Sequence, residues 1–174
     1  MSKFENPDPE ALREMFGYWD KFDVFLTAPF RDSKGSASLF EARFPFYEKI
    51  GSVVSGLGKS IFLPHRDLDS SESSERRESK LYDIIIPSSK LEIAYFPLSP
   101  HFESIRGYND RDMIDWDLMW SKARTSRIPS ISLYHAGTKY QQVRGLPNQV
   151  DEISFETEEE ALRELKRSVK RFFS

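Results

Sequence analysis

Short apolar segments alternate with longer amphipathic segments, and this alternation constrains the fold more than any other feature of the sequence. The apolar segments include 23–28, 59–63, 91–96 and 129–134, with a shorter one at 152–155. Such alternation predicts a parallel sheet with helices on both faces, and right-handed crossovers then place the chain among the doubly wound α/β folds. We therefore predict a five-stranded parallel sheet of the Rossmann or flavodoxin-like class, with an extra N-terminal helix.

Helix signals predict where the intervening segments begin and end. Pro45 is expected in the first turn of one helix and Gly58 just after its end, as is usual for these residues at helix termini. Pro87 is expected to stop the helix that precedes the third strand. Thr157 and Glu160 form a capping box that begins the last helix. We assign residues 1–22 to an N-terminal helical extension and 23–174 to one α/β domain.

Composition excludes several classes of function. The 174 residues include no cysteine, which excludes a disulfide scaffold, a cysteine-ligated metal and a cysteine nucleophile. The net charge of −3 argues against binding of a nucleic acid polymer, which needs many Lys and Arg residues. No apolar run approaches the roughly 20 residues that cross a membrane, and the N-terminus lacks the pattern of a signal peptide. We therefore expect a cytoplasmic protein without membrane contact.

The common nucleotide-cofactor motifs are absent from the sequence. The turn after the first apolar segment reads APFRDSKGSAS, which contains neither G-x-G-x-x-G nor a Walker A loop. The 3 histidines show no metal-ligand spacing. We expect no cofactor and no metal.

In doubly wound folds, ligands bind outside the carboxyl ends of the strands. After the first strand come Arg31 and Asp32, and after the second come His65 and Arg66. Arg31 suits a phosphate or carboxylate partner, although a solvated surface position is an equal alternative. His65 and Arg66 suit an anion, or an ion pair with Asp67 or Asp69. Residues 66–80, rich in Ser and charge, are predicted to form a loop, and whether it acts as a lid stays open.

The helix predicted to run from residue 112 to about residue 124 has an unusually acidic beginning. Capping and the helix dipole explain Asp110 and Asp112. Asp117 lies further along, next to Trp116 at the edge of the apolar stripe, where it would face a pocket. A carboxylate there stays ionised, which suits a nucleophile or the stabilisation of an oxocarbenium ion.

Five stretches carry a resemblance to a known family: VFLTAPFR at 24–31, FYEKIGSVVSGLGKSIFLPHRD at 46–67, LEIAYFPLSP at 91–100, DWDLMWSKA at 115–123 and IPSISLYHAG at 128–137. The chain resembles the nucleoside 2-deoxyribosyltransferase superfamily. The closer likeness is to its deoxynucleoside 5′-monophosphate N-hydrolase and CMP hydrolase branch. The resemblance implies cleavage or transfer at the N-glycosidic bond of a nucleoside or nucleoside 5′-monophosphate.

The resemblance also implies roles for individual residues. Asp117 matches the family's nucleophilic Glu, Arg31 the arginine near the sugar or phosphate, and Phe30 the aromatic residue that packs on the substrate. The residue that matches a family Asp before the third strand is Lys90, so Glu92 or Asp32 would have to supply a second carboxylate. We predict Asp117 as the catalytic residue. The predicted substrate-binding residues are Phe30, Arg31, Asp32, His65, Arg66, Glu92, Ser99 and Asp115.

These two differences from the family keep a second interpretation open. With Asp117 in place of Glu and Lys90 in place of Asp, the catalytic motif is degenerate. The alternative is a catalytically inactive homologue that binds nucleotides or has a regulatory role. Either way, the expected partner is a small nucleoside or nucleotide. The resemblance also implies a homodimer or higher homo-oligomer, in which 140–145 would complete a neighbour's pocket.

Overall fold

A computed structural model describes residues 22–30, 41–67, 85–96, 123–137 and 148–174. The predicted N-terminal helix, and most of the predicted helix from 112 to 124, lie outside these residues. No helix among the residues described is long and apolar enough to cross a membrane.

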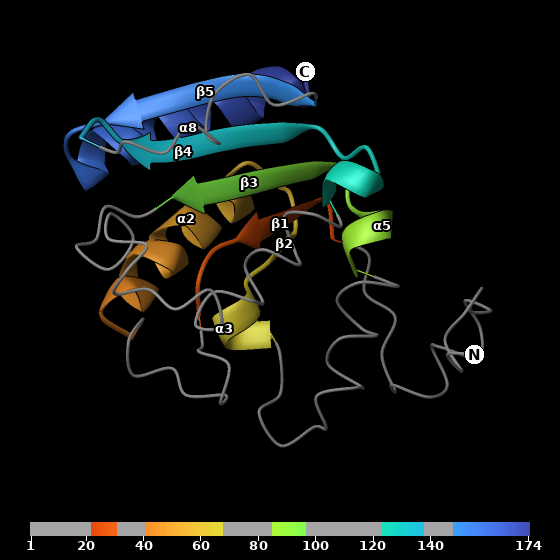
Figure 1. Ribbon diagram of the computed structural model, residues 1–174, viewed down its shortest axis with the longest axis horizontal. Coiled ribbons are helices and arrows are strands. Elements are labelled where there is room, and N and C mark those ends of the chain that lie inside the picture. Colours follow the sequence, from red (N-terminus) through yellow and green to blue (C-terminus); the bar gives the residue numbers. More distant parts are fainter. Residues whose placement is uncertain (1–21, 31–40, 68–84, 97–122, 138–147) are drawn as a thin grey trace.

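The described chain forms one parallel sheet of five strands (Figure 1). The spatial order is β2-β1-β3-β4-β5, and every neighbouring pair is parallel. This confirms the predicted doubly wound sheet, and the order is that of the flavodoxin-like class. The strand bounds are Val24–Thr27 for β1, Ile61–Phe62 for β2, Leu91–Phe96 for β3, Ser130–His135 for β4 and Gln149–Phe155 for β5.

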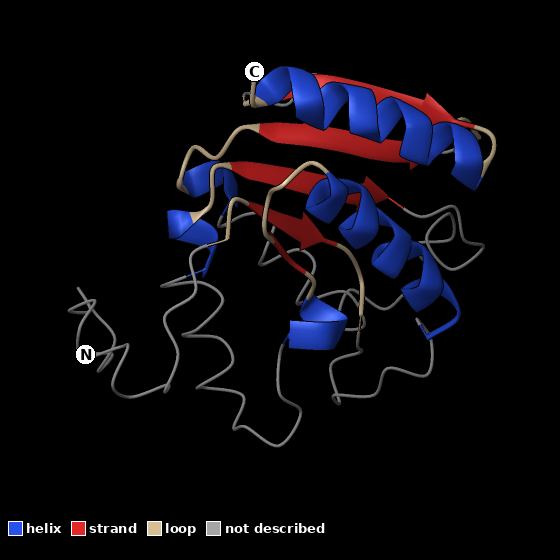
Figure 2. Cartoon of the chain, turned by 180° about the vertical axis from the view of Figure 1, so that it is seen from behind, coloured by secondary structure: helices blue, strands red, loops and turns tan. Residues whose placement is uncertain are grey.

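Two helices lie side by side across one face of the sheet, α2 (Phe44–Gly56) and α8 (Glu158–Phe172) (Figure 2). Between them and the strands lies the main apolar core. Alternate residues of each strand point to this face because successive side chains on a strand point in opposite directions. Each fully buried Leu, Ile or Phe stabilises the fold by roughly 1.5–3 kcal/mol. Strand residues in this core include Val24, Leu26, Ile61, Leu91, Ile93, Ile131, Leu133 and Ile153.

The opposite face of the sheet is half apolar and half polar. Its apolar cluster includes Phe25 and Phe62 from the strands, and Ile86 from the short helix α5 (Ile86–Ser88). Toward the middle of the sheet this face instead carries Thr27 and Glu92, both buried.

The predicted helix ends are partly confirmed. Pro45 lies in the first turn of α2, which follows a single 3-10 turn, η1 (Glu41–Arg43), and Gly58 follows its end with a φ of 77°. The prediction that Pro87 stops a helix is wrong, because Pro87 lies inside α5, which ends at Ser88. Proline is tolerated there because the first turn of a helix has no internal partner for its N–H. Arg66, predicted to begin a loop, instead belongs to the short helix α3 (Pro64–Asp67).

The predicted N-cap of α8 at Thr157 is confirmed, although the side chain of Glu160 reaches the residue before the cap instead of the cap itself. The Thr157 hydroxyl accepts a hydrogen bond from the Glu160 N–H at 3.2 Å, and the Glu160 carboxylate accepts one from the Glu156 N–H at 3.1 Å. Acidic residues fill the first turn of α8, and Lys170 and Arg171 lie in its last turn, which complements the helix dipole.

Replacing Thr157 with Ala should lower the free energy of unfolding by about 1 kcal/mol, because the Glu160 N–H loses its acceptor. Thr157→Ser, which keeps the hydroxyl, should cost much less. Urea unfolding of both variants measures the difference. Equal stability of Thr157→Ala and the unmodified protein would show that this cap does not support α8.

Candidate active site

The strand order places the candidate site at the carboxyl end of β1. The chain leaves β1 to form β2 on one side of it and later returns to form β3 on the other. In open α/β sheets the crevice at such a reversal is where ligands bind. Around this crevice the structure describes residues 28–30, after β1, and 63–67, after β2.

The chain that follows β1 is held firmly. The Tyr47 hydroxyl, from α2, donates a hydrogen bond to the Pro29 carbonyl at 2.7 Å. Phe30 is only 5% exposed and belongs to the apolar cluster that contains Phe25 and Phe62. This burial favours a core role for the Phe30 ring over the predicted contact with a substrate. The ring therefore anchors the segment that leads to Arg31.

His65 lies at the start of α3, at the carboxyl edge next to β1. Its imidazole stacks on the Phe44 ring, with centroids 4.6 Å apart, and meets the Tyr47 ring edge-on at 5.5 Å. Its Nε2 lies 2.8 Å from a carboxylate oxygen of Glu48. The side chain is only 7% exposed. Packing and one charged partner thus fix the orientation of the ring.

The second ring nitrogen of His65, Nδ1, is buried and has no hydrogen-bond partner among the residues described. Burial lowers the pKa of His65 below its usual value of 6.5, although the hydrogen bond and charge of Glu48 oppose this. The imidazole is therefore neutral at pH 7. Because the Glu48 carboxylate only accepts, Nε2 carries the proton and Nδ1 presents a lone pair. His65 thus presents a buried hydrogen-bond acceptor.

The Arg66 guanidinium makes its hydrogen bonds to neighbouring residues of α3 and β2. Its Nε donates to Asp67 at 2.9 Å, and a second nitrogen donates to the Ile61 carbonyl at 3.1 Å. This is the ion pair with Asp67 that the sequence left open as an alternative to anion binding. Asp67 in turn accepts from the Leu63 N–H at 2.8 Å, which closes α3 against the end of β2.

Glu92 lies within the sheet instead of at its edge. It is the second residue of β3 and is 1% exposed. The Thr27 hydroxyl donates a hydrogen bond to its carboxyl group at 2.6 Å. Ser130, its register partner on β4, also favours the ionised form. Arg31, with which Glu92 was predicted to share a site, lies outside the described residues.

Burial governs the charge of Glu92. Loss of hydration raises its pKa from 4.5 to about 8, against the opposing effects of Thr27, Ser130 and the Arg124 guanidinium. Glu92 is therefore protonated at neutral pH. The sequence analysis considered Glu92 as an ionised second carboxylate, whereas the folded chain holds it as a neutral carboxyl group. A neutral carboxyl group can donate as well as accept a hydrogen bond.

Sequence reasoning missed the polar partners of Glu92. Thr27 ends an otherwise apolar run, and Ser130 and Ser132 alternate with apolar residues in β4. The alternation of Ser with apolar residues in β4 indicates a row of polar side chains on one face of the sheet. The predicted residues that lie outside the described part of the chain are Asp117, Arg31, Asp32, Ser99, Asp115 and the segment 140–145.

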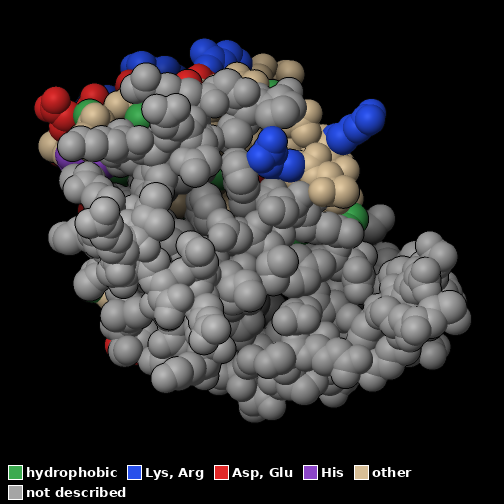
Figure 3. Space-filling view, viewed as in Figure 1, with side chains coloured by type: hydrophobic (Ala, Val, Ile, Leu, Met, Phe, Trp, Pro, Cys, Tyr) green, Lys and Arg blue, Asp and Glu red, His purple; other side chains and the backbone are tan. Residues whose placement is uncertain are grey.

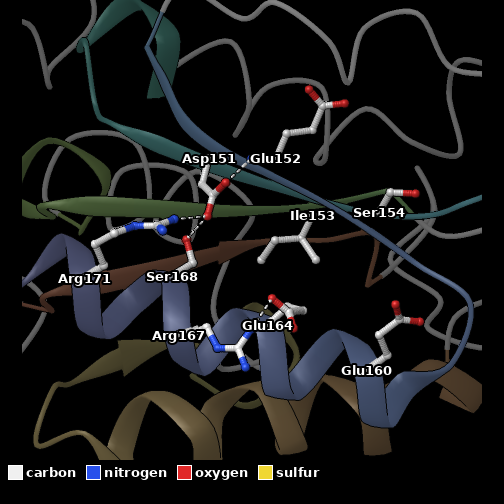
Figure 4. A pocket seen from close by; sticks show the side chains of 9 residues that line it. All are labelled: Asp151, Glu152, Ile153, Ser154, Glu160, Glu164, Arg167, Ser168 and Arg171. Carbon is white, nitrogen blue, oxygen red and sulfur yellow. Dashed lines mark hydrogen bonds and ion pairs between the residues drawn. The ribbon is translucent and has the colours of Figure 1, made fainter.

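A cavity of about 400 Å³ lies between β5 and α8 at the far edge of the sheet (Figure 4). Its charged groups pair with one another: Asp151 accepts from Arg171 at 2.7 Å and from the Ser168 hydroxyl at 2.5 Å. Asp151 also accepts from the Glu152 N–H at 2.8 Å. In Figure 3 several acidic and basic side chains lie along the upper edge of the molecule, where Figure 1 places β5. Such mutual pairing is typical of a solvated surface, so we favour the edge at β1 as the site.

Within the described ranges, no group of three or more His, Asp or Glu side chains is placed to hold a metal ion.

The fold is similar to that of a solved enzyme, the Clostridium botulinum CMP N-glycosidase BcmB. The TM-score is 0.58 at 19% sequence identity, over 83% of this chain and 97% of that chain. This likeness shows the fold. No protein-family model and no curated protein matches the chain.

The buried Glu92 should make stability depend on pH. Between pH 4.5 and about 8 the unfolded chain has released this proton and the folded chain has kept it. Stability therefore falls as pH rises through this window, by up to about 1.4 kcal/mol per pH unit from this group. Urea unfolding at pH 5 and pH 8 measures the fall.

In Glu92→Gln, which cannot ionise, that part of the fall should disappear. Glu156→Gln, at an exposed position, is the matched control and should behave as the unmodified protein does. The same fall in all three proteins would contradict a buried neutral carboxyl group at Glu92.

Proposed function

We propose that this protein cleaves or transfers at the N-glycosidic bond of a nucleoside or nucleoside 5′-monophosphate. The observation that carries the proposal is the shared fold with a CMP N-glycosidase, which extends over 97% of that enzyme. The sequence resemblance to the nucleoside 2-deoxyribosyltransferase superfamily supports it independently. Membership of that superfamily, and of its nucleoside monophosphate hydrolase branch, is part of the proposal.

In this proposal the chemistry takes place at the carboxyl end of β1. Asp117 is the carboxylate that attacks the anomeric carbon or stabilises the positive charge that develops there. Arg31 binds the phosphate or sugar. Because the base leaves with a pair of electrons, it must gain a proton as the bond breaks, from water or from a neutral acid.

His65 is better suited to the sugar than to the phosphate. A neutral imidazole has no charge to offer a phosphate, whereas its free Nδ1 lone pair accepts a hydrogen bond from a hydroxyl group. In this proposal His65 therefore accepts a hydrogen bond from a hydroxyl group of the sugar. This role replaces the anion binding that was considered from the sequence.

Incubation with a panel of nucleosides and their 5′-monophosphates, followed by chromatography of free base, tests the activity. We expect base release from at least one compound, and loss of at least a hundredfold in kcat for Asp117→Ala, because catalytic carboxylates contribute several kcal/mol. Asp115→Ala, two residues away, serves as a neighbouring comparison and should have a smaller effect on kcat.

Two outcomes would contradict this proposal. One is the absence of base release from every compound, and the other is release unchanged in Asp117→Ala. If the panel gives no turnover but one nucleotide raises the melting temperature, the inactive nucleotide-binding homologue is the correct interpretation.

His65→Phe should raise KM about tenfold with little change in kcat, because Phe retains the stacking on Phe44 but removes the hydrogen-bond acceptor. His135→Phe, at the end of β4, changes another histidine in a similar setting and should leave KM unchanged. Steady-state kinetics on the best substrate separate KM from kcat. An unchanged KM for His65→Phe would remove His65 from the binding site.

A further inference from the structure

Glu48 connects helix α2 to helix α3 at the candidate site. One oxygen of its carboxylate lies 2.8 Å from Nε2 of His65, and the other lies 3.9 Å from the Arg66 guanidinium. The side chains of Glu48 and Arg66 are both about half exposed, and such an ion pair contributes at most about 1 kcal/mol to stability. The contact with the buried imidazole is shorter, and it determines the chemical state of His65.

A neutral imidazole has two ways to hold its proton, and Glu48 selects one of them. The proton is on Nδ1 or on Nε2, and the other nitrogen then accepts a hydrogen bond. Because the Glu48 carboxylate only accepts, the proton of His65 stays on Nε2. The Phe44 ring, stacked at 4.6 Å, and the Tyr47 ring, edge-on at 5.5 Å, limit rotation of the imidazole. The lone pair of Nδ1 therefore has a fixed direction.

This lone pair is kept at a cost in stability. Nδ1 of His65 is buried and has no hydrogen-bond partner in the part of the chain that the structure describes. A buried acceptor without a donor costs roughly 1–3 kcal/mol. The neighbouring Arg66 does not relieve it, because its guanidinium donates to Asp67 and to the Ile61 carbonyl. An acceptor kept open at the carboxyl edge of the sheet suits a donor that arrives with a ligand.

We propose that Glu48 is a positioning residue, which holds the proton of His65 on Nε2 and so keeps Nδ1 as an acceptor for a hydroxyl group of the ligand. The inference rests on the proposed function for its effect on substrate. The state of the imidazole belongs to the folded chain and can be measured without turnover.

The position of the proton also decides which part of a nucleotide lies beside α3. A sugar hydroxyl donates to the Nδ1 lone pair, whereas a phosphate dianion has only acceptor oxygens and is repelled by it. The charges that reach the ring are those of Glu48 from α2, and of Arg66 and Asp67 from α3. Two of these three are negative, so their sum does not favour a further anion. The sugar, and not the phosphate, therefore lies on the α3 side of the crevice.

Nitrogen NMR of the imidazole rings on the full chain tests the state of His65 directly. At pH 7, Nδ1 should have the chemical shift of an unprotonated ring nitrogen and Nε2 that of a protonated one. In Glu48→Gln the amide can turn its oxygen or its NH2 group toward Nε2, and in Glu48→Ala no partner is left. Both variants should therefore move the two shifts toward each other. Glu158→Gln, which removes another exposed carboxylate with a basic partner, is the matched control and should change neither.

The pKa of His65 is a second readout that a purely structural role of Glu48 would not move. The hydrogen bond and the charge of Glu48 both raise this pKa, while burial lowers it. Loss of the carboxylate removes both raising effects. The midpoint of the His65 titration should therefore fall in Glu48→Gln and stay unchanged in Glu158→Gln.

Ligand probes and kinetics test the consequence for substrate. Cytidine should shift the ring signals of His65, and inorganic phosphate at the same concentration should not. Glu48→Gln should raise KM by about threefold to tenfold with little change in kcat. In a His65→Phe background the same change should alter KM by less than about twofold, because Glu48 acts only through the imidazole.

Ring shifts that stay the same in both Glu48→Gln and Glu48→Ala, or a proton found on Nδ1, overturn the control of His65 by Glu48. A response of His65 to phosphate but not to cytidine overturns the placement of the sugar. An unchanged KM in Glu48→Gln, or an increase that persists in full beside His65→Phe, overturns the positioning role. Absence of base release overturns the proposed function instead, and the ring shifts still decide whether Glu48 holds the proton.

Discussion

The parallel pairing of β1 with β2 on one side and β3 on the other is the constraint on which the rest of the structure depends. It buries β1 between two neighbours, so Val24, Phe25 and Leu26 have no exposed surface. It also creates the reversal of strand order that defines the candidate site. Tyr47 and Glu92 then act on the same short segment, Thr27 to Phe30, from opposite faces. The position of the site is a consequence of the sheet topology.

The two faces of the sheet have different roles. The face under α2 and α8 holds the main apolar core and supplies most of the stability of the fold. The other face carries a partly polar stripe that costs stability, because each buried polar group must recover its lost hydration through hydrogen bonds. The Thr27 hydroxyl and the Glu92 carboxyl group recover part of theirs by pairing with each other at 2.6 Å.

Much of the fold could be predicted from the sequence. Strand β3 was predicted with its observed bounds, and β1 and β4 were within a residue at each end, because buried parallel strands give continuous apolar runs. The cap at Thr157 was predicted because its signal is local. Pro87 was misjudged because a proline in the first turn and a proline after the last turn produce similar local patterns. β5 begins earlier than predicted, since an edge strand needs fewer apolar residues.

The site was less predictable, for a physical reason. The sequence shows that His65 and Glu92 carry titratable groups, but their protonation depends on burial by residues far away in the chain. His65 was considered as an anion ligand, whereas its burial and its pairing with Glu48 make it a neutral acceptor. Glu92 was considered as a contact to substrate, whereas its burial between strands makes it a neutral group inside the sheet. Long-range packing decides both properties, and local pattern carries little information about it.

The location of the site is the central claim, and an NMR map of amide shifts on addition of CMP tests it most directly. We expect the largest changes at Ala28, Phe30 and His65, around the carboxyl end of β1. We expect little change at Asp151, Glu164 and Arg171, which line the cavity between β5 and α8. Changes concentrated in the β5–α8 cavity, or no change at millimolar CMP, would contradict a site at the carboxyl end of β1.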